Sequence, residues 1–566
     1  MLSRTVQAIR QGLALTLAVA GLGLFVFAAV ALSGPGRIDV VDGLTRYEVA
    51  RSLAEHGDTV IRDQRVTFLV FSGRGGRRYT SYRLPHSVLG VAAVALADLT
   101  GPVSEPRRHF FFSLVGAAAC ALLAAVFAVW FLKQGHSAAR AILWSAGGIF
   151  CSPVWFYGTT TFDESLGAVT VVAALVVAVH ARRATGRAGA PVPPGVDFGG
   201  PGAPARLGVD DGGPGAPARP RTGTHACLGA AAAGLLLGLA FNCKPPLAIF
   251  VLAALAGNAD ERLPLVRQRA RLAWMIAGLA LGVAAYVGYD LYKFPPWAME
   301  TTGGAAERYA PLWPGRPLFG LLGLTIGLGA GALWYWPPAC LALAGLAVER
   351  RRERWFAPWT LAAVAIYVAF IATLSFFVGE PAWGPRYLTP AFAVLWLFAP
   401  QGAALLRRRT VAVLLAAGFA VQIAGLSVET VRLYIEEQWP VDRFLIDRWF
   451  YFRPLDSKLV QRPREIWEIL TDRGPRAQRF TPAAEPTFPV SVPRKPIDVR
   501  RYHVLNSLRP WWASQQYLEP SQRPVDIEKT AALLFSLAGL GLAAVAPTFL
   551  RGAKKERMGF LAAMLE

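Results

Sequence analysis

The sequence is poor in charge for its length. Of its 566 residues, only 17% are Asp, Glu, Lys or Arg, whereas 54% are hydrophobic and the mean hydropathy is +0.38. A soluble protein of this size carries more charge, so the balance argues against an ordinary soluble enzyme. It indicates a protein that crosses a membrane many times.

Cysteine and histidine are scarce and carry no metal-binding pattern. The five cysteines lie in or beside apolar runs, and no C-x-x-C occurs. The seven histidines show neither H-x-x-H nor H-E-x-x-H spacing. These absences argue against a disulfide framework and against a Cys/His metal site.

Basic residues are plentiful, with a formal net charge of +21, but they are gathered in short segments between apolar runs. Examples are KQGHSAAR (133–140), ERRRER (349–354) and RGAKKER (551–557). Short loops rich in Lys and Arg remain in the cytoplasm, where anionic lipid headgroups are their ordinary partner. We therefore expect membrane lipids, and not nucleic acid, to balance this charge.

Apolar runs long enough to cross a bilayer recur along the chain. The first lacks an A-x-A cleavage site and is too long for a signal peptide, so we expect a retained span. The pattern predicts an all-α integral membrane protein of the plasma (inner) membrane, with both termini cytoplasmic. About twelve spans are expected, near 12–33, 110–132, 139–157, 163–182, 226–242, 246–258, 272–290, 331–348, 357–378, 388–405, 410–428 and 528–550. The pair flanking NCKPP is short and could instead be one broken or re-entrant element.

Three parts of the chain are expected from this topology. Residues 1–430 form a transmembrane module, 431–527 an exterior segment, and 528–566 the last span with a basic cytoplasmic tail. Within the module, the first exterior loop (34–109) predicts an amphipathic helix over 43–56, a strand-like RVTFLVFSG and a helix after Pro85. A Pro/Gly-rich cytoplasmic linker (183–225) contains a near-perfect tandem duplication and is expected to be disordered.

Acidic, basic and tyrosine side chains from many separate span ends fall on the predicted outer face. They are Asp39, Asp42, Glu48, Arg83, Asp163, Glu164, Lys244, Tyr289, Asp290, Lys293, Arg386 and Tyr387. Their common side of the membrane predicts a single cleft there. This shared sidedness is stronger evidence than any one residue.

Each of these residues also has a purely structural interpretation. Asp42 could cap the helix predicted over 43–56, and Asp163 would suit the dipole of the span that follows it. Lys244 and Arg386 could extend toward the membrane surface. Tyr387 could be an aromatic anchor at that surface.

Taken in order, the motifs resemble those of the GT-C glycosyltransferases, the multi-span class that includes protein O-mannosyltransferases and aminoarabinose transferases. The resemblance extends over residues 12–430. Its pieces are DGLTRYEVARSLAEHGD, GRRYTSYRLPHSVLGV, SPVWFYGTTTFDESLGA, GLLLGLAFNCKPPLAIF, AAYVGYDLYKFPPW, GALWYWPPACLALAGL and WGPRYLTPAF.

The resemblance implies a polyprenyl-phosphate sugar donor and an acceptor on the exterior face. By motif position it assigns the general base to Asp42, with Asp39 as the alternative, and a second acid to Asp163 or Glu164. It assigns binding of the donor phosphate to Arg83 and Lys244. At the position of Lys244, arginine is more usual in the class. This sequence has Asp-Gly at 42–43 where the class commonly has Asp-Glu.

The chemistry of sugar transfer agrees with these assignments. A base must take the proton of the acceptor hydroxyl, and cations must stabilise the departing phosphate. Arg386 would complete the positive group with Arg83 and Lys244, since arginine engages phosphate oxygens in pairs. A single base favours direct displacement with inversion. Further substrate contacts are expected from Glu48, Tyr82 and Tyr387, and a divalent cation (Mg or Mn) could take part.

Two alternatives come from other functional classes. A lipid or polysaccharide transporter or flippase would also place charges near span ends, but transporters tend to bind at the membrane midplane. A non-catalytic protein of cell-envelope assembly could keep the same fold. Intact Asp42, Arg83 and Asp163 favour an enzyme over that second alternative.

Overall fold

The computed structural model describes residues 2–186, 223–259, 264–295, 316–351, 353–374, 377–379, 383–428, 457–471, 508–516 and 523–565. Most of the predicted linker 183–225 therefore lies outside the described residues. So does most of the exterior segment predicted over 431–527, although two helices within it are described.

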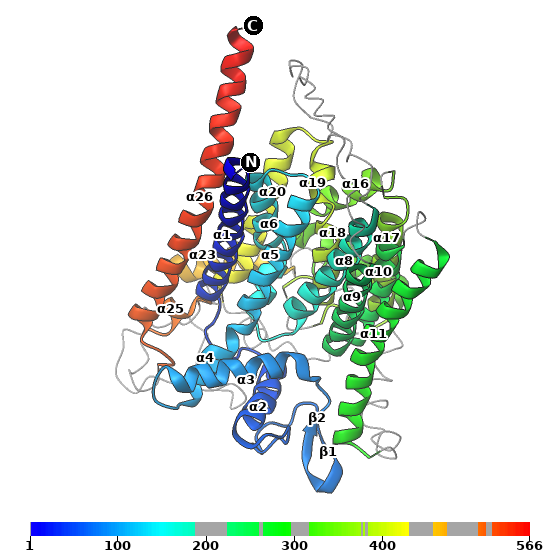
Figure 1. Cartoon of the computed structure of the whole chain (residues 1–566). Coiled ribbons are helices and arrows are strands. Elements are labelled where there is room, and N and C mark those ends of the chain that lie inside the picture. Colours follow the sequence, from blue (N-terminus) through cyan, green and yellow to red (C-terminus); the bar gives the residue numbers. More distant parts are fainter. Residues whose placement is uncertain are drawn as a thin grey trace.

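Most of the described residues are helical (Figure 1). In the first half of the chain the elements are α1 (Leu2–Ser33), α2 (Val41–His56), β1 (Val70–Ser72), η1 (Arg74–Gly76), β2 (Arg78–Thr80), α3 (Leu84–Leu99), α4 (Glu105–Ser113), α5 (Val115–Lys133), α6 (Ala138–Phe150), α7 (Val154–Gly158), α8 (Glu164–Gly186), α9 (Gly223–Cys243), η2 (Pro245–Phe250), α10 (Val251–Asn258) and α11 (Leu265–Lys293). In the second half they are α14 (Pro317–Thr325), α15 (Ala332–Tyr335), α16 (Ala339–Glu349), α17 (Phe356–Ala372), η4 (Arg386–Leu388), α18 (Thr389–Trp396), α19 (Ala399–Ala403), α20 (Arg408–Ser427), α23 (Lys458–Thr471), α25 (Trp511–Ser514) and α26 (Ile527–Leu565).

Within the described residues, seven helices are long and apolar enough to cross a membrane, and five shorter apolar helices accompany them. The seven are Ile9–Ser33, Glu105–Lys133, Glu164–Arg183, Thr224–Cys243, Leu265–Lys293, Arg408–Ser427 and Ile527–Leu550, each at a predicted span. Peripheral helices such as α11 and α26 expose large apolar side chains, Leu281 and Leu540 among them, as lipid-facing helices do. The chain is an all-α integral membrane protein, as its composition predicts.

Three predicted spans are divided where proline interrupts the helix. The helix expected over 331–348 is split into α15 and α16 around Pro337 and Pro338. Breaks also separate α18 from α19, next to Pro400, and α6 from α7, at Pro153. Proline lacks an N–H and clashes with the preceding turn, so the helix is interrupted within the spans predicted near 331–348, 388–405 and 139–157.

The NCKPP segment joins two separate elements. α9 ends at Cys243, and the chain then forms η2 and α10. Near its start this second element contacts Gly167 of α8 through Leu247, and near its end Gly257 contacts Val179 of α8. The η2–α10 element therefore runs alongside α8 in the same direction, and the NCKPP turn lies beside the beginning of α8.

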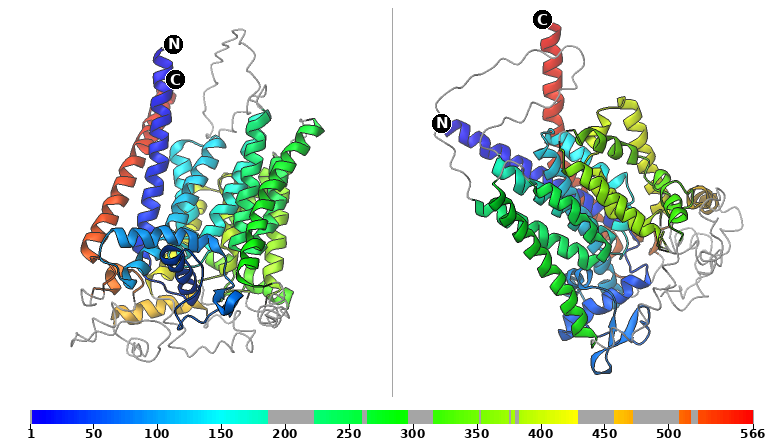
Figure 2. Two further views of the ribbon diagram at one scale, coloured as in Figure 1. Left: turned by 60° about the horizontal axis from the view of Figure 1, so that its bottom comes forward. Right: turned by 90° about the vertical axis from the view of Figure 1, so that its right-hand side faces the viewer.

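The first exterior loop folds across one end of the bundle, which we call the outer end (Figures 1 and 2). Its helix α2 confirms the helix predicted over 43–56, and α3 confirms the helix after Pro85. The strand-like stretch contributes β1, which pairs antiparallel with β2 through Phe71 and Tyr79. The N-terminal end of α1 and the C-terminal end of α26 lie at the opposite end of the bundle (Figure 1).

Candidate active site

Eight polar side chains from separate elements meet at the outer end of the bundle, and we call them the outer cluster. α2 supplies two of them, the loop after β2 one, the start of α8 two, the NCKPP turn one and η4 two. They are Asp42, Arg46, Tyr82, Asp163, Glu164, Lys244, Arg386 and Tyr387.

Two buried carboxylates at the start of α8 hold the cations together. Asp163 lies 3.3 Å from the Arg46 guanidinium and 3.4 Å from Lys244 Nζ. Glu164 is fully buried; it pairs with Lys244 and lies 3.2 Å from Arg386 Nε. Three cations from three elements thus converge on two adjacent acids, which keeps each buried charge compensated.

Aromatic rings cover the same cations. The Arg46 guanidinium lies over the Tyr82 ring at 4.1 Å, and Lys244 Nζ lies over the Tyr387 ring at 4.6 Å. Arg386 stacks on Phe162 at 3.9 Å and donates a hydrogen bond of 3.0 Å to the Tyr387 hydroxyl. Cation–π contacts of this kind orient a charge without neutralising it.

Asp42 lies in the first turn of α2 and is only partly buried. The N-cap residue of α2 is Val40, and no side chain caps the helix there, so the interpretation of Asp42 as an N-cap is wrong. Instead Asp42 faces Tyr82: the pKa of Tyr82 is raised by burial and by the negative charge of Asp42, with which its hydroxyl interacts. Asp42 is also near enough to act electrostatically on Arg46 and Arg386.

Asp163 is held in its charged form. Burial opposes its ionisation, but the positive charges of Arg46 and Lys244 outweigh burial and lower its pKa. A carboxylate stabilised in this way is a weak proton acceptor near neutral pH. Asp163 is paired with Arg46 and Lys244 and serves as an anchor of the cations, whereas Asp42 is partly exposed and is the candidate for the base.

Gly43 explains why this chain has Asp-Gly at 42–43. A Cβ atom on Gly43 would lie 1.8 Å from Oγ1 of Thr161. Only glycine lets the first turn of α2 approach the turn over 159–163 this closely. The missing side chain lets the helix turn that carries Asp42 pack against the turn that leads to Asp163.

Six of the twelve residues singled out in the sequence have their described contacts outside the outer cluster: Asp39, Glu48, Arg83, Tyr289, Asp290 and Lys293. Asp39 accepts a hydrogen bond of 3.0 Å from Arg509. Arg83 pairs with Asp290 of α11 and donates to the Tyr286 hydroxyl. Asp39 and Arg83 are close in sequence to Asp42 and Tyr82 of the outer cluster, but their described contacts lie outside that cluster.

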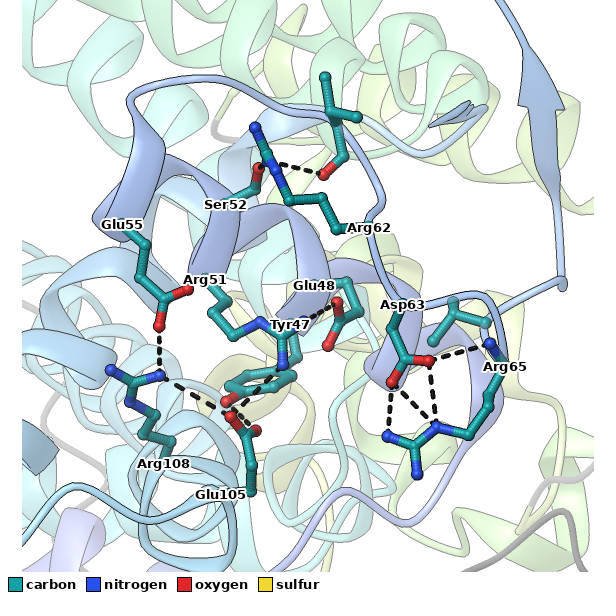
Figure 3. A network of polar contacts seen from close by, with 12 residues as sticks. Tyr47, Glu48, Arg51, Ser52, Glu55, Arg62, Asp63, Arg65, Glu105 and Arg108 are labelled. Carbon is teal, nitrogen blue, oxygen red and sulfur yellow. Dashed lines mark hydrogen bonds and ion pairs between the residues drawn. The ribbon is translucent and has the colours of Figure 1, made fainter. Parts of the chain in front are cut away.

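Glu48 lies in a different network on α2, which Figure 3 draws. Its carboxylate pairs with Arg51 at 2.7 Å. We call this group the exterior network; it consists of Tyr47, Glu48, Arg51, Ser52, Glu55, Arg62, Asp63, Arg65, Glu105 and Arg108. The substrate contact predicted for Glu48 stays a prediction.

Arg46 and Arg509 make important contacts in the structure but are not predicted as site residues by the sequence. Arg46 stands four residues after Asp42, and that spacing on a helix places both on one face, so a sequence signal for Arg46 does exist. Arg509 has none, because it is separated from Asp39 by most of the chain. Its position depends on the tertiary fold alone.

The described part of the chain contains no group of three or more His, Cys, Asp or Glu residues placed to hold a metal ion. Asp163 and Glu164 face Lys244, whose ammonium lies where a cation between them would sit. These acids do not form a vacant carboxylate pair, and a role for Mg or Mn stays a prediction.

No protein-family model and no curated protein matches the chain. Two crystal structures of ArnT from Cupriavidus metallidurans are similar to it. The one bound to undecaprenyl phosphate has 15% identity and a TM-score of 0.45, covering 93% of this chain and 77% of that chain. The apo structure has 13% identity and a TM-score of 0.44, covering 96% and 78%. ArnT is an aminoarabinose transferase of the GT-C class, the class that the sequence motifs resemble. At values this low, the similarity by itself assigns neither a site nor a reaction to this chain.

Proposed function

We propose that this protein is a membrane glycosyltransferase that moves a sugar from a polyprenyl-phosphate donor to an acceptor hydroxyl on the exterior face. The observation that carries the proposal is the outer cluster. A partly exposed carboxylate, Asp42, lies near Arg46 and Arg386, two of the three cations that two buried acids hold in place. A base next to a positive group is what transfer from a lipid phosphate requires.

Asp42 would take the proton from the acceptor hydroxyl as that oxygen attacks the anomeric carbon. The bond between that carbon and the phosphate oxygen then breaks, and the lipid phosphate leaves with the bonding electrons. One base and no covalent intermediate give inversion at the anomeric carbon. The Tyr82 hydroxyl, next to Asp42, is placed to orient the carboxylate.

Arg46, Lys244 and Arg386 would stabilise the phosphate. Among the described residues, Nη1 of Arg46 is buried and makes no hydrogen bond. A buried donor without an acceptor costs about 1–3 kcal/mol, and a phosphate oxygen would satisfy it. Because the donor is a lipid, its tail would lie between or beside the spans while its headgroup reaches the outer cluster.

We propose with this function that the protein lies in the plasma membrane and that both termini are cytoplasmic. Short basic loops favour that orientation, and the N-terminus of α1 and the C-terminus of α26 lie on the side away from α2 (Figure 1). A transporter is the less favoured alternative, because the ion pairs of the described spans lie at span ends and not midway along them.

The test is Asp42→Asn in purified protein reconstituted in lipid. The donor is undecaprenyl phosphate carrying one labelled sugar at a time, and a membrane and cell-wall fraction supplies the acceptor. We expect release of undecaprenyl phosphate to fall about 10²- to 10⁴-fold, the usual contribution of a general base. Asp63→Asn, a carboxylate of the same loop that pairs with Arg65, is the matched control and should keep full activity.

Two outcomes would contradict the proposal. Full transfer by Asp42→Asn would remove Asp42 as the base. Absence of any donor turnover by the wild-type protein across the sugars, combined with movement of intact lipid between leaflets, would favour a flippase. Loss of unfolding cooperativity in Asp42→Asn would point to a structural role for this carboxylate.

A further inference from the structure

A short segment near the end of the chain, 508–516, packs against the loop that leads from α1 to Asp42. It contains α25, and it joins the bundle through an isolated bridge between Leu508 and Val428 and through the Arg509 amide, which donates to the Ser427 carbonyl. The function proposed above gives this segment no role, although it lies close to the outer cluster.

Backbone and side-chain hydrogen bonds from the segment fix the course of residues 31–35. The Trp511 amide donates to the Gly34 carbonyl at 3.0 Å, and its indole N–H to the Ala31 carbonyl at 3.1 Å. Trp512 Nε1 donates to the Leu32 carbonyl at 2.9 Å, and Gln515 Nε2 to the Pro35 carbonyl at 3.0 Å. These carbonyls belong to the end of α1 and the turn after it, where no further helical N–H is available to them.

Gly36 completes the fit between the two segments. Its φ of +59° is in the left-handed region, and a Cβ there would lie 2.5 Å from the Trp511 Cβ. The indole of Trp511 is fully buried at this point. Contact with Trp511 therefore restricts the backbone at Gly36 to a single conformation. Gly36 lies three residues before Asp39.

Arg509 connects this loop with a second one. Its guanidinium Nη2 donates to Oδ2 of Asp39 at 3.0 Å and to Oγ1 of Thr159 at 3.1 Å, and it lies 4.7 Å from the ring of Phe156. The Arg509 side chain is 0% exposed and that of Asp39 4%. A planar guanidinium with two fixed acceptors defines the separation of the segments that carry them.

Those two segments are the ones that carry the acids of the outer cluster. Asp42 follows Asp39 by three residues, and Asp163 follows Thr159 by four. Between them, Gly43 lies against Thr161 with no room for a Cβ. Movement of Asp39 relative to Thr159 would therefore change the separation of Asp42 from Asp163 and from the cations that Asp163 holds.

We infer that Arg509 is a positioning residue, which sets the distance between the base Asp42 and the cation-holding acids of α8 by clamping Asp39 to Thr159. The inference rests on the proposed function and deepens it. Asp39 is then not an alternative base but the anchor of the loop that presents Asp42. It is buried against a guanidinium, whereas Asp42 is partly exposed beside Tyr82.

The first test compares Arg509→Gln, Asp39→Asn and the double variant in the transfer assay. A displacement of about 1 Å can cost about 100-fold in rate, so we expect each single variant to lose about that much in kcat. The KM for the donor should change much less, because Arg46, Lys244 and Arg386 are intact. Arg509→Lys keeps the charge without the planar fork and should recover part of kcat. Arg464→Gln, an exposed arginine of the same exterior segment, should leave kcat unchanged.

The double variant separates positioning from charge burial. Each single change removes one charge of the buried Arg509–Asp39 pair and should lower the unfolding temperature, and removing both charges should restore it. If Arg509 positions Asp42, kcat stays low in the double variant although the unfolding temperature recovers. Recovery of kcat together with stability would overturn the inference, and so would wild-type kcat in Arg509→Gln.

A second readout does not depend on sugar transfer. Asp42→Cys is labelled with a water-soluble maleimide in a background where Cys227 and Cys340, the two cysteines that are not buried, are Ser. Adding Arg509→Gln should raise the labelling rate severalfold, because the loop is no longer held, whereas adding Arg464→Gln should not. An unchanged rate overturns the inference even if transfer is observed. A raised rate without any transfer by the wild-type protein would instead count against the proposed function.

Discussion

The outer cluster and the exterior network share helix α2 but are built from different kinds of contact. In the outer cluster the partners are far apart in the chain, as in Arg46 with Asp163 and Arg386 with Glu164. In the exterior network many partners are near neighbours, as in Arg51 with Glu48 and Arg65 with Asp63 (Figure 3). The first arrangement exists only when the whole bundle has folded, whereas much of the second needs only the loop itself.

The most exposed charges belong to the exterior network, although Glu48 of that network is as buried as the charges of the outer cluster. The side chain of Glu164 is 0% exposed and that of Arg386 is 7% exposed, while Arg65 is 90% exposed. Charges taken out of water are costly unless they are paired or wait for a ligand. α2 therefore has one side that stabilises the exterior loop and another that presents charge to the bundle. Three changes test that division.

The largest effect is expected from Lys244→Met, which breaks the outer cluster. Lys244 pairs with Asp163 and Glu164, so its loss leaves two buried carboxylates undercompensated. We expect a loss of about 3–5 kcal/mol in the free energy of unfolding and loss of binding of undecaprenyl phosphate. Denaturant unfolding in detergent and a lipid-binding assay measure the two effects.

The matched change in the exterior network is Arg65→Gln. Its side chain is exposed, and we expect no measurable shift of the unfolding temperature and no loss of lipid binding. If Lys244→Met were as mild as Arg65→Gln, the distinction between the two groups would fail.

The pH dependence of stability tests the exterior network through Glu48. Burial raises the pKa of Glu48 from its ordinary 4.5 to about 7, although the charge of Arg51 acts to lower it. A raised pKa means that the folded state binds the proton more tightly. Glu48 therefore contributes stability that is complete below pH 4.5 and is lost as the pH rises through about 7.

Glu48→Gln should remove this dependence. At about 1.4 kcal/mol per pKa unit the effect is at most about 3 kcal/mol between pH 4.5 and 8. Unfolding temperatures measured across that range should fall with pH in the wild-type protein and remain flatter in the variant. Asp98→Asn is the control: hydrogen bonding to Arg108 lowers the pKa of Asp98 further below this range. An equal slope in Glu48→Gln would show that another group is responsible.

The smallest change in stability is expected from Gly43→Ala, which forces a Cβ toward Thr161. Overpacking of this kind costs about 1–3 kcal/mol, and displacement of Asp42 by about 1 Å would reduce transfer about 100-fold. Gly288→Ala in α11 is the matched control, since nothing lies within 4 Å of its Cβ position. It should be neutral or stabilising, by up to about 1 kcal/mol. Wild-type transfer by Gly43→Ala would show that the close approach of α2 is not needed.

Much of the outer cluster was predictable because membrane topology sorts residues by side. Asp42, Asp163, Glu164, Lys244 and Arg386 all follow or precede apolar runs, so counting spans places them at one end of the bundle. Sidedness does not give distance within that plane. Arg83 lies on the predicted side, yet it pairs with Asp290, and Asp39 pairs with Arg509.

The sequence by itself determined the all-α membrane class, the helices of the first exterior loop and the end of the bundle where the acids and bases collect, because hydropathy and periodicity are local properties. Only the tertiary structure decided that Val40, and not Asp42, is the N-cap of α2, that Gly43 fits against Thr161, and that Arg509 reaches Asp39. Those facts depend on contacts between segments up to 470 residues apart. A single sequence carries no local signal for such contacts, since they are set by the packing of the helices between them.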